Sequence, residues 1–322
     1  MYSSILSGIM GLCVGDALGV PVEALTRAEL EQRPVRNMRS FGTYNLPAGT
    51  WSDDTSMTLC LVESLCKGLD YKDIMDNFFK WLTTGAFTPY GEAFGVGGAT
   101  RRALARYTSG VSPLECGGRT EKDNGNGSLM RILPIIFYLQ AVYGLHNMIN
   151  AEAMNIIHEV SSLTHAHPRS LIACGIYISI AAQILEKKEL AVAIETGVRE
   201  ATEFYQNHGD FRAELSHYQR ILDLGAFART PVENIKSSGY VVFTLEAAIW
   251  CLLNTKNYKD CVLKAVNLGE DSDTVAAVAG GLAGLYYGYE QIPKEWLAAV
   301  AKRDYIEQLC QEFAKALSKN SL

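Results

Sequence analysis

Two short acidic clusters each stand directly before a stretch with the apolar spacing of a helix. The first is Trp51-Ser52-Asp53-Asp54-Thr55, and the second is Gly269-Glu270-Asp271-Ser272-Asp273-Thr274. Asp, Ser and Thr at such positions are typical of helix N-caps, where a side-chain oxygen accepts a backbone N–H. One cap needs only one side chain, however, and each cluster offers at least two carboxylates with hydroxyls beside them.

A metal site follows if the two helix starts meet in the fold. Four carboxylates would then converge with the hydroxyls of Ser52 and Thr274. Like charges that close together need cations between them, and ligands made only of oxygen suit Mg²⁺ or Mn²⁺ better than Zn²⁺. We therefore expect a divalent-metal site, on the condition that the clusters are neighbours; capping alone is the alternative.

Two Gly-rich segments also precede predicted helices. Residues 91–100 lead into a helix expected near Arg101, and residues 123–131 lead into one expected from Ile132. Free N–H groups at a helix start bind phosphate, and glycine lets a ligand approach the backbone. An ordinary tight connection is the alternative. Neither segment has the P-loop pattern or follows a predicted strand, so a Rossmann site is not supported.

His165 and His167 lie between two predicted helices. A His-x-His pair suggests zinc, but no Cys or third His stands at matching spacing. Structural hydrogen bonding and contact with a ligand, such as a sugar hydroxyl, are the other two interpretations.

The elements that must hold these residues show the periodicity of helices. Ile5, Ile9, Leu12 and Cys13 mark a first helix, and further helices are predicted at 54–67, 73–82, 151–163, 171–186, 190–206, 212–224, 240–253, 258–267, 274–287 and 304–317. Strict alternation of polar and apolar residues is hard to find. We therefore predict an all-α fold, organised as a single domain over residues 1–322. The breaks at 33–52, 86–98, 109–128 and 226–239 are too short and unbiased to be interdomain linkers.

Charge and apolar content narrow the function class. The 29 Lys and Arg against 35 Asp and Glu leave a net charge of −6, which disfavours nonspecific binding to nucleic acid or an anionic membrane. The N-terminus lacks a signal-peptide pattern. The uncharged stretches 170–185 and 274–289 are shorter than the roughly 20 residues that cross a bilayer. We expect a cytoplasmic protein without nucleic-acid or membrane partners, and a monomer is compatible with the sequence.

Five segments, in this order, resemble the motifs of the ADP-ribosylglycohydrolase family: 11–23, 51–55, 125–131, 164–168 and 271–274. The resemblance spans roughly residues 5 to 290. It is strongest to the branch of the bacterial dinitrogenase reductase-activating glycohydrolases, through residues 95–102, 164–168 and 237–242. Glu270 stands where many members have Gly. The substitution leaves the metal motif intact and is expected to change charge or access at its rim.

The resemblance implies an all-helical fold of the ADP-ribosylglycohydrolase type with a central binuclear metal cleft. It assigns two Mg²⁺ or Mn²⁺ ions to ligands at Ser52, Asp53, Asp54, Asp271, Asp273 and Thr274. It places Glu23 near the metals and the substrate ribose. It gives substrate contacts to Gly95, Gly97, Gly98, Asn126, Gly127, Ser128, Met130, His165 and Tyr240, with the glycine loops at the diphosphate and His165 at a ribose.

The function that this implies is the removal of ADP-ribose from a modified protein side chain, with arginine preferred. Cleavage of the bond between the ribose and the guanidinium nitrogen passes through an oxocarbenium-like state. Asp54, Asp271 and Asp273 would position the metals, while Glu23 or a water activated by the metals handles the proton. Alternatives are a hydrolase of O-linked (serine) ADP-ribose or small ADP-ribose derivatives, a non-catalytic ADP-ribose binder, and a phosphohydrolase that cuts the diphosphate.

Overall fold

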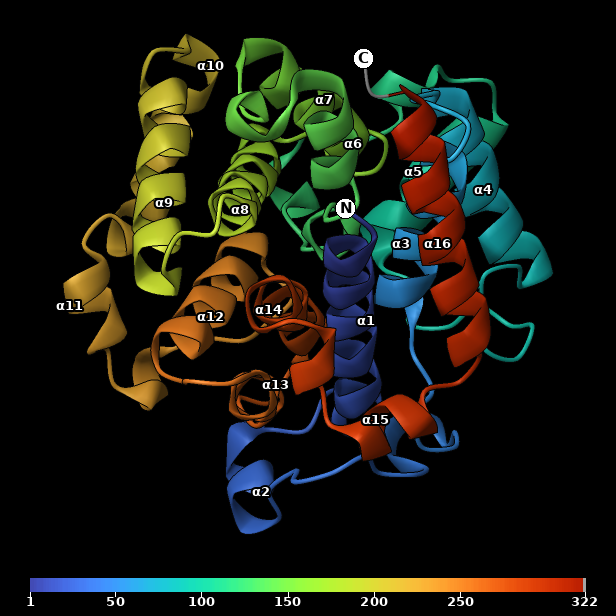
Figure 1. The fold of residues 1–322 in the computed structure, drawn as a ribbon, viewed down its shortest axis with the longest axis vertical. Coiled ribbons are helices and arrows are strands. Elements are labelled where there is room, and N and C mark those ends of the chain that lie inside the picture. The colour runs from blue at the N-terminus through green and yellow to red at the C-terminus, as the bar shows by residue number, and fades with distance from the viewer. Residues whose placement is uncertain (321–322) are drawn as a thin grey trace.

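The computed structural model describes residues 1–320, and helices with the loops that join them make up this part of the chain (Figure 1). No β-strand forms within it; three isolated bridges, such as Phe41 with Leu46, are the only pairings. The prediction of an all-α fold is confirmed. The α-helices are α1 Tyr2–Gly19, α2 Arg27–Gln32, α3 Asp53–Leu65, α4 Tyr71–Thr84, α5 Gly98–Thr108, α6 Ile135–Tyr143, α7 Ala151–Ser162, α8 Pro168–Leu185, α9 Leu190–Gln206, α10 Gly209–Arg212, α11 Leu224–Ala228, α12 Val241–Leu253, α13 Tyr258–Val266, α14 Ser272–Tyr287, α15 Lys294–Ala299 and α16 Arg303–Asn320. Residues 321 and 322 of the predicted 1–322 domain lie outside the described residues.

The first helix lies at the centre of the bundle. α1 runs beside α14 (Figure 1), and both are buried on nearly every side because their residues are apolar or small all round. Tyr258 of α13 donates a hydrogen bond to the carbonyl of Gly11 at 2.6 Å. Tyr177 of α8 donates one to the carbonyl of Val278 at 2.8 Å. These buried bonds tie α13 to α1 and α8 to α14.

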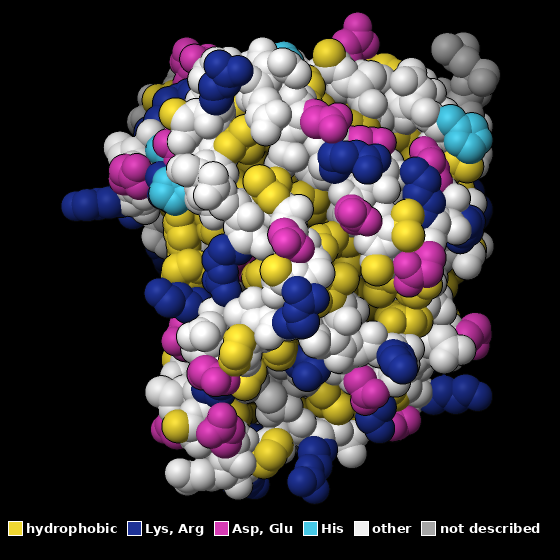
Figure 2. Space-filling view, turned by 90° about the vertical axis from the view of Figure 1, so that its left-hand side faces the viewer, with side chains coloured by type: hydrophobic (Ala, Val, Ile, Leu, Met, Phe, Trp, Pro, Cys, Tyr) yellow, Lys and Arg dark blue, Asp and Glu magenta, His cyan; other side chains and the backbone are white. Residues whose placement is uncertain are grey.

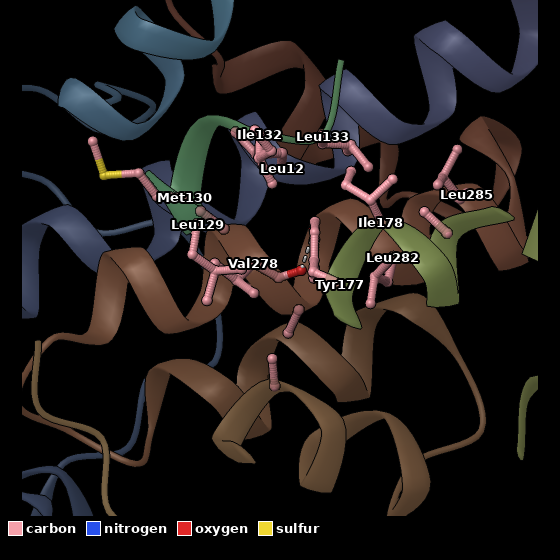
Figure 3. Close-up of a cluster of buried hydrophobic side chains, with 14 of the residues drawn as sticks. Leu12, Leu129, Met130, Ile132, Leu133, Tyr177, Ile178, Val278, Leu282 and Leu285 are labelled. Carbon is pink, nitrogen blue, oxygen red and sulfur yellow. Dashed lines mark hydrogen bonds between the residues drawn. The ribbon is translucent and has the colours of Figure 1, made fainter. Parts of the chain in front are cut away.

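A dense apolar cluster supports the region where the predicted site residues lie. Figure 3 shows side chains from α1, α8, α14 and the segment 129–133 meeting in it. Leu12, Leu133 and Leu282 are at most 1% exposed. Such a close-packed interior holds the helix ends above it in fixed positions.

Within residues 1–320, two helices meet the length and composition of a membrane span: residues Tyr2–Val22 and α8, which at 18 residues is longer than the stretch judged too short from sequence. In each, 94% of the apolar window is buried inside the protein, as in the core helices of a folded domain. On the face that carries α9 and α11, acidic and basic side chains are interspersed with apolar ones (Figure 2).

The predicted helix boundaries agree best with the structure where the apolar periodicity extends over many residues. The helix predicted at 190–206 is α9, and those predicted at 240–253 and 258–267 begin or end one residue away from α12 and α13. The helix predicted at 212–224 is wrong, because residues Ala213–Ile221 form a 3₁₀ helix, η7, between the short α10 and α11. Its buried residues Tyr218 and Ile221 are three apart, a spacing that fits a 3₁₀ turn as well as an α-helix.

Candidate metal and substrate site

A stripe of small residues lets α1 and α14 approach closely enough to form the site. A Cβ added to Gly11 would lie 2.4 Å from the carbonyl oxygen of Gly280, and one added to Gly15 would lie 2.1 Å from that of Ala276. One added to Gly19 would lie 2.3 Å from the Cα of Asp273. Because these contacts run in opposite directions along the two helices, the end of α1 meets the start of α14. Asp273 is therefore fixed directly beside the segment that leads to Glu23.

Asp16, one turn before the end of α1, holds the first acidic cluster in place. Its carboxylate accepts hydrogen bonds from the backbone and hydroxyl of Ser52, the latter at 2.8 Å. It also accepts bonds from the backbone and hydroxyl of Thr55. Ser52 is the N-cap of α3 as well, accepting a bond from the Asp54 N–H. Ser52 therefore does cap the helix, as the alternative interpretation predicted. Capping does not account for Asp16, however, a carboxylate from another helix that orients the cluster.

The two acidic clusters are neighbours in the structure. The Thr274 hydroxyl donates to Asp54 Oδ2 at 3.3 Å across 220 residues of sequence. Oxygen atoms of Asp16, Asp54 and Asp273 lie within 4.8 Å of one another, and so do those of Glu23, Asp271 and Asp273. Asp273 belongs to both groups, so the carboxylates form two adjoining clusters. The spatial condition set for the metal site is met.

Electrostatics make this arrangement costly without positive charge. Burial, followed by repulsion from Asp16, raises the pKa values of Asp53 and Asp54 well above their ordinary range. Burial and the neighbouring Asp54 do the same to the pKa of Asp273. Burial also raises the pKa of Asp16, to about 6, against the hydrogen bonds it accepts. Like charges packed this way are stable as carboxylates only when cations lie among them.

The donor set fits hard divalent cations. Asp54 Oδ1 and Glu23 Oε2 are buried oxygens without a hydrogen-bond partner within residues 1–320, one in each carboxylate group. A buried oxygen of this kind needs a ligand. The surrounding donors are carboxylates and hydroxyls, with no His or Cys in either group. This chemistry suits Mg²⁺ or Mn²⁺.

A cavity of about 730 Å³ opens from the carboxylates toward the glycine loops. Glu23, Asp53, Asp271 and Asp273 line its acidic end, and the lining also includes the basic Lys122 and Arg102, the latter beside Gly98. Of the residues predicted from sequence, Glu23, Asp53, Gly95, Gly97, Gly98, Asn126, Gly127, Met130, His165, Asp271, Asp273 and Thr274 line it.

Four of the named residues lie outside the cavity lining. Ser52 and Asp54 are buried behind it among the carboxylates. Ser128 is fully buried, where its hydroxyl accepts a bond from Ser161 at 2.8 Å and lies 3.6 Å from the Cys174 sulfur. Tyr240 is the N-cap residue of α12, with its hydroxyl bonded to Arg169.

The glycine loops are attached to the acidic end. The Asn126 side chain donates to Asp271 Oδ2 at 2.6 Å, and its backbone N–H donates to the carbonyl of Gly239. Gly95 adopts a φ of +73°, and a Cβ there would lie 2.7 Å from Asp53 Oδ1. A side chain at Gly95 would therefore crowd a predicted metal ligand. The helix after the first loop begins at Gly98 rather than near Arg101, which brings its free N–H groups into the cavity lining.

The two histidines have different surroundings. His165 lines the cavity, and its Nδ1 lies 2.8 Å from the Thr164 hydroxyl. His167 caps α8 by accepting the Arg169 N–H. His167 also lies near Glu121 and Glu214, but both carboxylates are paired with Arg169. Arg169 thus supplies the positive charge that a metal would otherwise bring.

Several residues of the site were given no role by the sequence analysis. Asp16 falls within the motif at residues 11–23 but was assigned no function. The one indication of its role is that it is a lone acidic residue in an otherwise apolar helix. Arg102 and Lys122 are the two basic residues that line the cavity. Tyr44, in a loop predicted only as a break, acts on the Glu23 carboxylate by lowering its pKa against burial, and it packs on Phe94 with ring centroids 4.8 Å apart.

The loop of Tyr44 is fastened to the Glu23 segment. The Thr43 hydroxyl donates to the carbonyl of Glu23 at 2.7 Å. On the opposite side, Ala24 and Leu25 pair with the backbone of Glu270 through two hydrogen bonds of 2.7 Å. Glu23 is therefore held between two loops that are distant from each other in the sequence, so no short motif could predict this contact.

The fold is all-helical, and its centre gathers buried carboxylates beside a large cavity. The model of the family described as ADP-ribosylglycohydrolase matches residues 1–321. The chain belongs to this family and is an enzyme of its hydrolase class.

The relatives agree with that placement. The chain is 33% identical over 310 residues to ADP-ribosylarginine hydrolase Tri1 of Pseudomonas putida (strain GB-1), covering 94% of this chain and 76% of the relative. It is 32% identical over 303 residues to the ADP-ribosyl-[dinitrogen reductase] glycohydrolase of Rhodospirillum rubrum, covering 92% and 90%. A solved structure described as an ADP-ribosylglycohydrolase-related protein complex has a TM-score of 0.78 at 33% identity, covering 100% of this chain and 99% of that chain. The resemblance seen in the sequence is confirmed.

Proposed function

We propose that this enzyme removes ADP-ribose from arginine side chains of modified proteins and uses two divalent cations, Mg²⁺ or Mn²⁺. The observation that carries the proposal is the pair of carboxylate groups that share Asp273 at one end of the cavity. The name of the Pseudomonas putida relative, ADP-ribosylarginine hydrolase Tri1, supports arginine as the linked side chain. ADP-ribosylated protein is then the substrate, and free ADP-ribose is the product. A cytoplasmic location remains part of this proposal.

The proposed ligands are the six that the sequence indicated: Ser52, Asp53, Asp54, Asp271, Asp273 and Thr274. The geometry gives Asp16 a positioning role, because its oxygens already accept bonds from Ser52 and Thr55. When bound, the cations would supply charge that grips the ribose hydroxyls and stabilises the transition state.

The cavity also accounts for the remainder of the ligand. The start of α5 at Gly98 presents free N–H groups, and Arg102 and Lys122 add positive charge on the same side. These groups would bind the diphosphate. The ribose to be cleaved would then lie at the acidic end, with its anomeric carbon near Glu23.

Glu23 is the proposed proton carrier. Burial raises the pKa of its carboxyl, while the hydrogen bond from Tyr44 acts to lower it. Its Oε2 has no partner, so it can accept a proton from the attacking water and pass it to the departing guanidine nitrogen. General-base catalysis of this kind contributes about 10²–10⁴-fold in rate.

A release assay tests this function. The purified protein is incubated with arginine-modified and serine-modified proteins, with Mg²⁺ or Mn²⁺ or with chelator, and the products are identified. We expect intact ADP-ribose from the arginine-modified protein and loss of release with chelator. Release from the serine-modified protein alone would move the enzyme to the O-linked class. AMP as the product would make it a phosphohydrolase, and tight ADP-ribose binding without release would make it a binder.

Variants connect the activity to the site. Asp273→Asn should reduce turnover by at least about 10²-fold, because one residue serves both carboxylate groups. Asp53→Asn should also reduce it strongly. Asp210→Asn, an exposed position on α10, is the matched control. Turnover near the wild-type rate in Asp53→Asn or Asp273→Asn would contradict the assignment.

A further inference from the structure

Arg131 is buried completely beneath the glycine loop, at the end of the 3₁₀ helix η5 (Leu129–Arg131). Its guanidinium stacks on the Phe78 ring at 4.8 Å. Its Nη2 donates to the carbonyl of Val160 at 3.2 Å and to the Thr164 hydroxyl oxygen at 2.7 Å. A buried cation that donates to a threonine next to a cavity histidine has a consequence for the protonation of that histidine.

The hydrogen bonds can be assigned one donor at a time. A guanidinium has only donors, so the Thr164 oxygen accepts from Arg131. The hydroxyl hydrogen of Thr164 is then available for one acceptor, and His165 Nδ1 lies 2.8 Å away. Thr164 is fully buried. If Nδ1 carried the proton instead, the hydroxyl hydrogen would have no partner in these bonds, which is unfavourable in a dry interior.

The opposite edge of the ring faces the cavity. A Cβ on Gly127 would lie 2.7 Å from His165 Cε1 and 3.2 Å from Nε2, and one on Gly125 would lie 3.6 Å from Nε2. Both glycines line the cavity. Burial, with Arg131 adding to it, lowers the pKa of His165 to about 3, so the ring is neutral at physiological pH and has a single N–H to place.

We propose that Arg131, acting through the Thr164 hydroxyl, holds His165 in the tautomer protonated at Nε2, so that His165 donates a hydrogen bond into the cavity and selects an acceptor oxygen of the ligand. Arg131 and Thr164 are positioning residues, since neither lines the cavity. The tautomer does not depend on the proposed function; only the identity of the ligand rests on it.

The tautomer is measured in the ligand-free protein. Histidine labelled with ¹⁵N gives long-range ¹H–¹⁵N correlations that distinguish the protonated ring nitrogen from the other, and a His165→Phe variant assigns the resonances. We expect His165 to be protonated at Nε2. A wild-type protein protonated at Nδ1, or an even mixture, would overturn the proposal without any bearing on the hydrolase activity.

Variants then test the two positioning residues. Thr164→Val removes the hydroxyl at nearly constant volume and should raise the Nδ1-protonated fraction, whereas Thr164→Ser should restore the wild-type tautomer. Arg131→Lys retains a hydrogen-bond donor for Thr164 and should therefore also retain the wild-type tautomer. Thr202→Val removes a buried hydroxyl that bonds only to carbonyls of its own helix and serves as the control. An unchanged tautomer in Thr164→Val would remove Thr164 from the proposal.

Binding measurements identify the oxygen that His165 contacts. The loss of one well-placed hydrogen bond should weaken ADP-ribose binding by Thr164→Val about two- to tenfold, with Thr164→Ser near wild type. Equal weakening of ADP would assign the contact to the diphosphate. Weakening of ADP-ribose alone would assign it to the distal ribose. If neither ligand were affected in a variant with an altered tautomer, His165 would not be the donor.

Discussion

At the scale of single residues, Asp123 shows how a carboxylate outside the cavity stabilises a loop that lines it. Asp123 accepts hydrogen bonds from the backbone and hydroxyl of Thr120 and from Arg102, the last at 3.0 Å. Its side chain is only 9% exposed. Burial acts to raise its pKa, but the bonds from Thr120 and Arg102 outweigh burial and lower the pKa to about 2.

This shift predicts a pH-dependent contribution to stability. Because the pKa is lower in the folded protein than the ordinary 3.8, the contribution is present above pH 4 and is lost as the pH falls toward 2. It amounts to roughly 2 kcal/mol. Asp123→Asn should lower the melting temperature at pH 6, and the difference from wild type should shrink as the pH is lowered to 3. A constant difference across this range would contradict the expected role of ionisation.

Glu270 is a second residue to consider, because its backbone conformation lowers the stability of the folded protein. It has a φ of +58°, in the left-handed region that favours glycine, and it lines the acidic end of the cavity. Glu270→Gly should raise the free energy of unfolding by roughly 0.5–1 kcal/mol because it relieves the backbone. Glu270→Ala removes the same charge but keeps the strained φ, so it should gain less. Thermal denaturation of both variants separates backbone strain from charge, and an equal gain in the two would assign the effect to charge.

At the scale of elements, the close approach of α1 to α14 determines the geometry of the carboxylates. Gly15→Ala would drive a methyl group against the carbonyl oxygen of Ala276, a backbone atom that cannot move aside easily. We expect a loss of about 2–4 kcal/mol of stability. Weaker Mn²⁺ binding by the folded fraction should accompany it, because Asp16 and Asp273 move apart.

The control is Gly209→Ala, where an added Cβ meets nothing within 4 Å. Chemical denaturation gives the stability, and calorimetric titration with Mn²⁺ gives the affinity. Wild-type stability in Gly15→Ala would show that α1 and α14 can separate at little cost.

The helices and the acidic clusters could be predicted from the sequence because they depend on local signals: apolar spacing, caps and short motifs. The positioning of Asp16 and Tyr44 could not, since each acts through contacts between segments distant in the chain. Asp16 reaches Ser52 across 36 residues, and no periodicity reports that pairing. The 3₁₀ helix η7 was missed for a different reason: Tyr218 and Ile221 fit both helical periods.

At the scale of the whole molecule, acidic and basic side chains line the same cavity. The chain carries a net charge of −6, and the acidic end concentrates part of it in carboxylates that lie too close together to be stable alone. The basic Arg102 and Lys122 line the same cavity. Occupation of the acidic end by cations should therefore stabilise the entire fold.

Mn²⁺ should raise the melting temperature by several degrees. An ion present at 100 times its dissociation constant adds roughly 2.7 kcal/mol to the stability of the folded state. The rise should be reversed by chelator, retained by Asp210→Asn and largely absent from Asp273→Asn. If Asp273→Asn showed the same rise as wild type, the ion would be binding elsewhere.

The pairing of Gly19 with the start of α14 also affects how the protein can be made. The Ser272 hydroxyl bonds the Gly19 carbonyl across 253 residues. At about 5–20 residues per second, the ribosome needs roughly 13–50 s to produce the second partner after the first. Throughout that interval the face of the nascent N-terminal helix that α14 covers in the folded protein remains exposed. The two carboxylate groups that share Asp273 can therefore form only after residue 273 of the 322 has been synthesised.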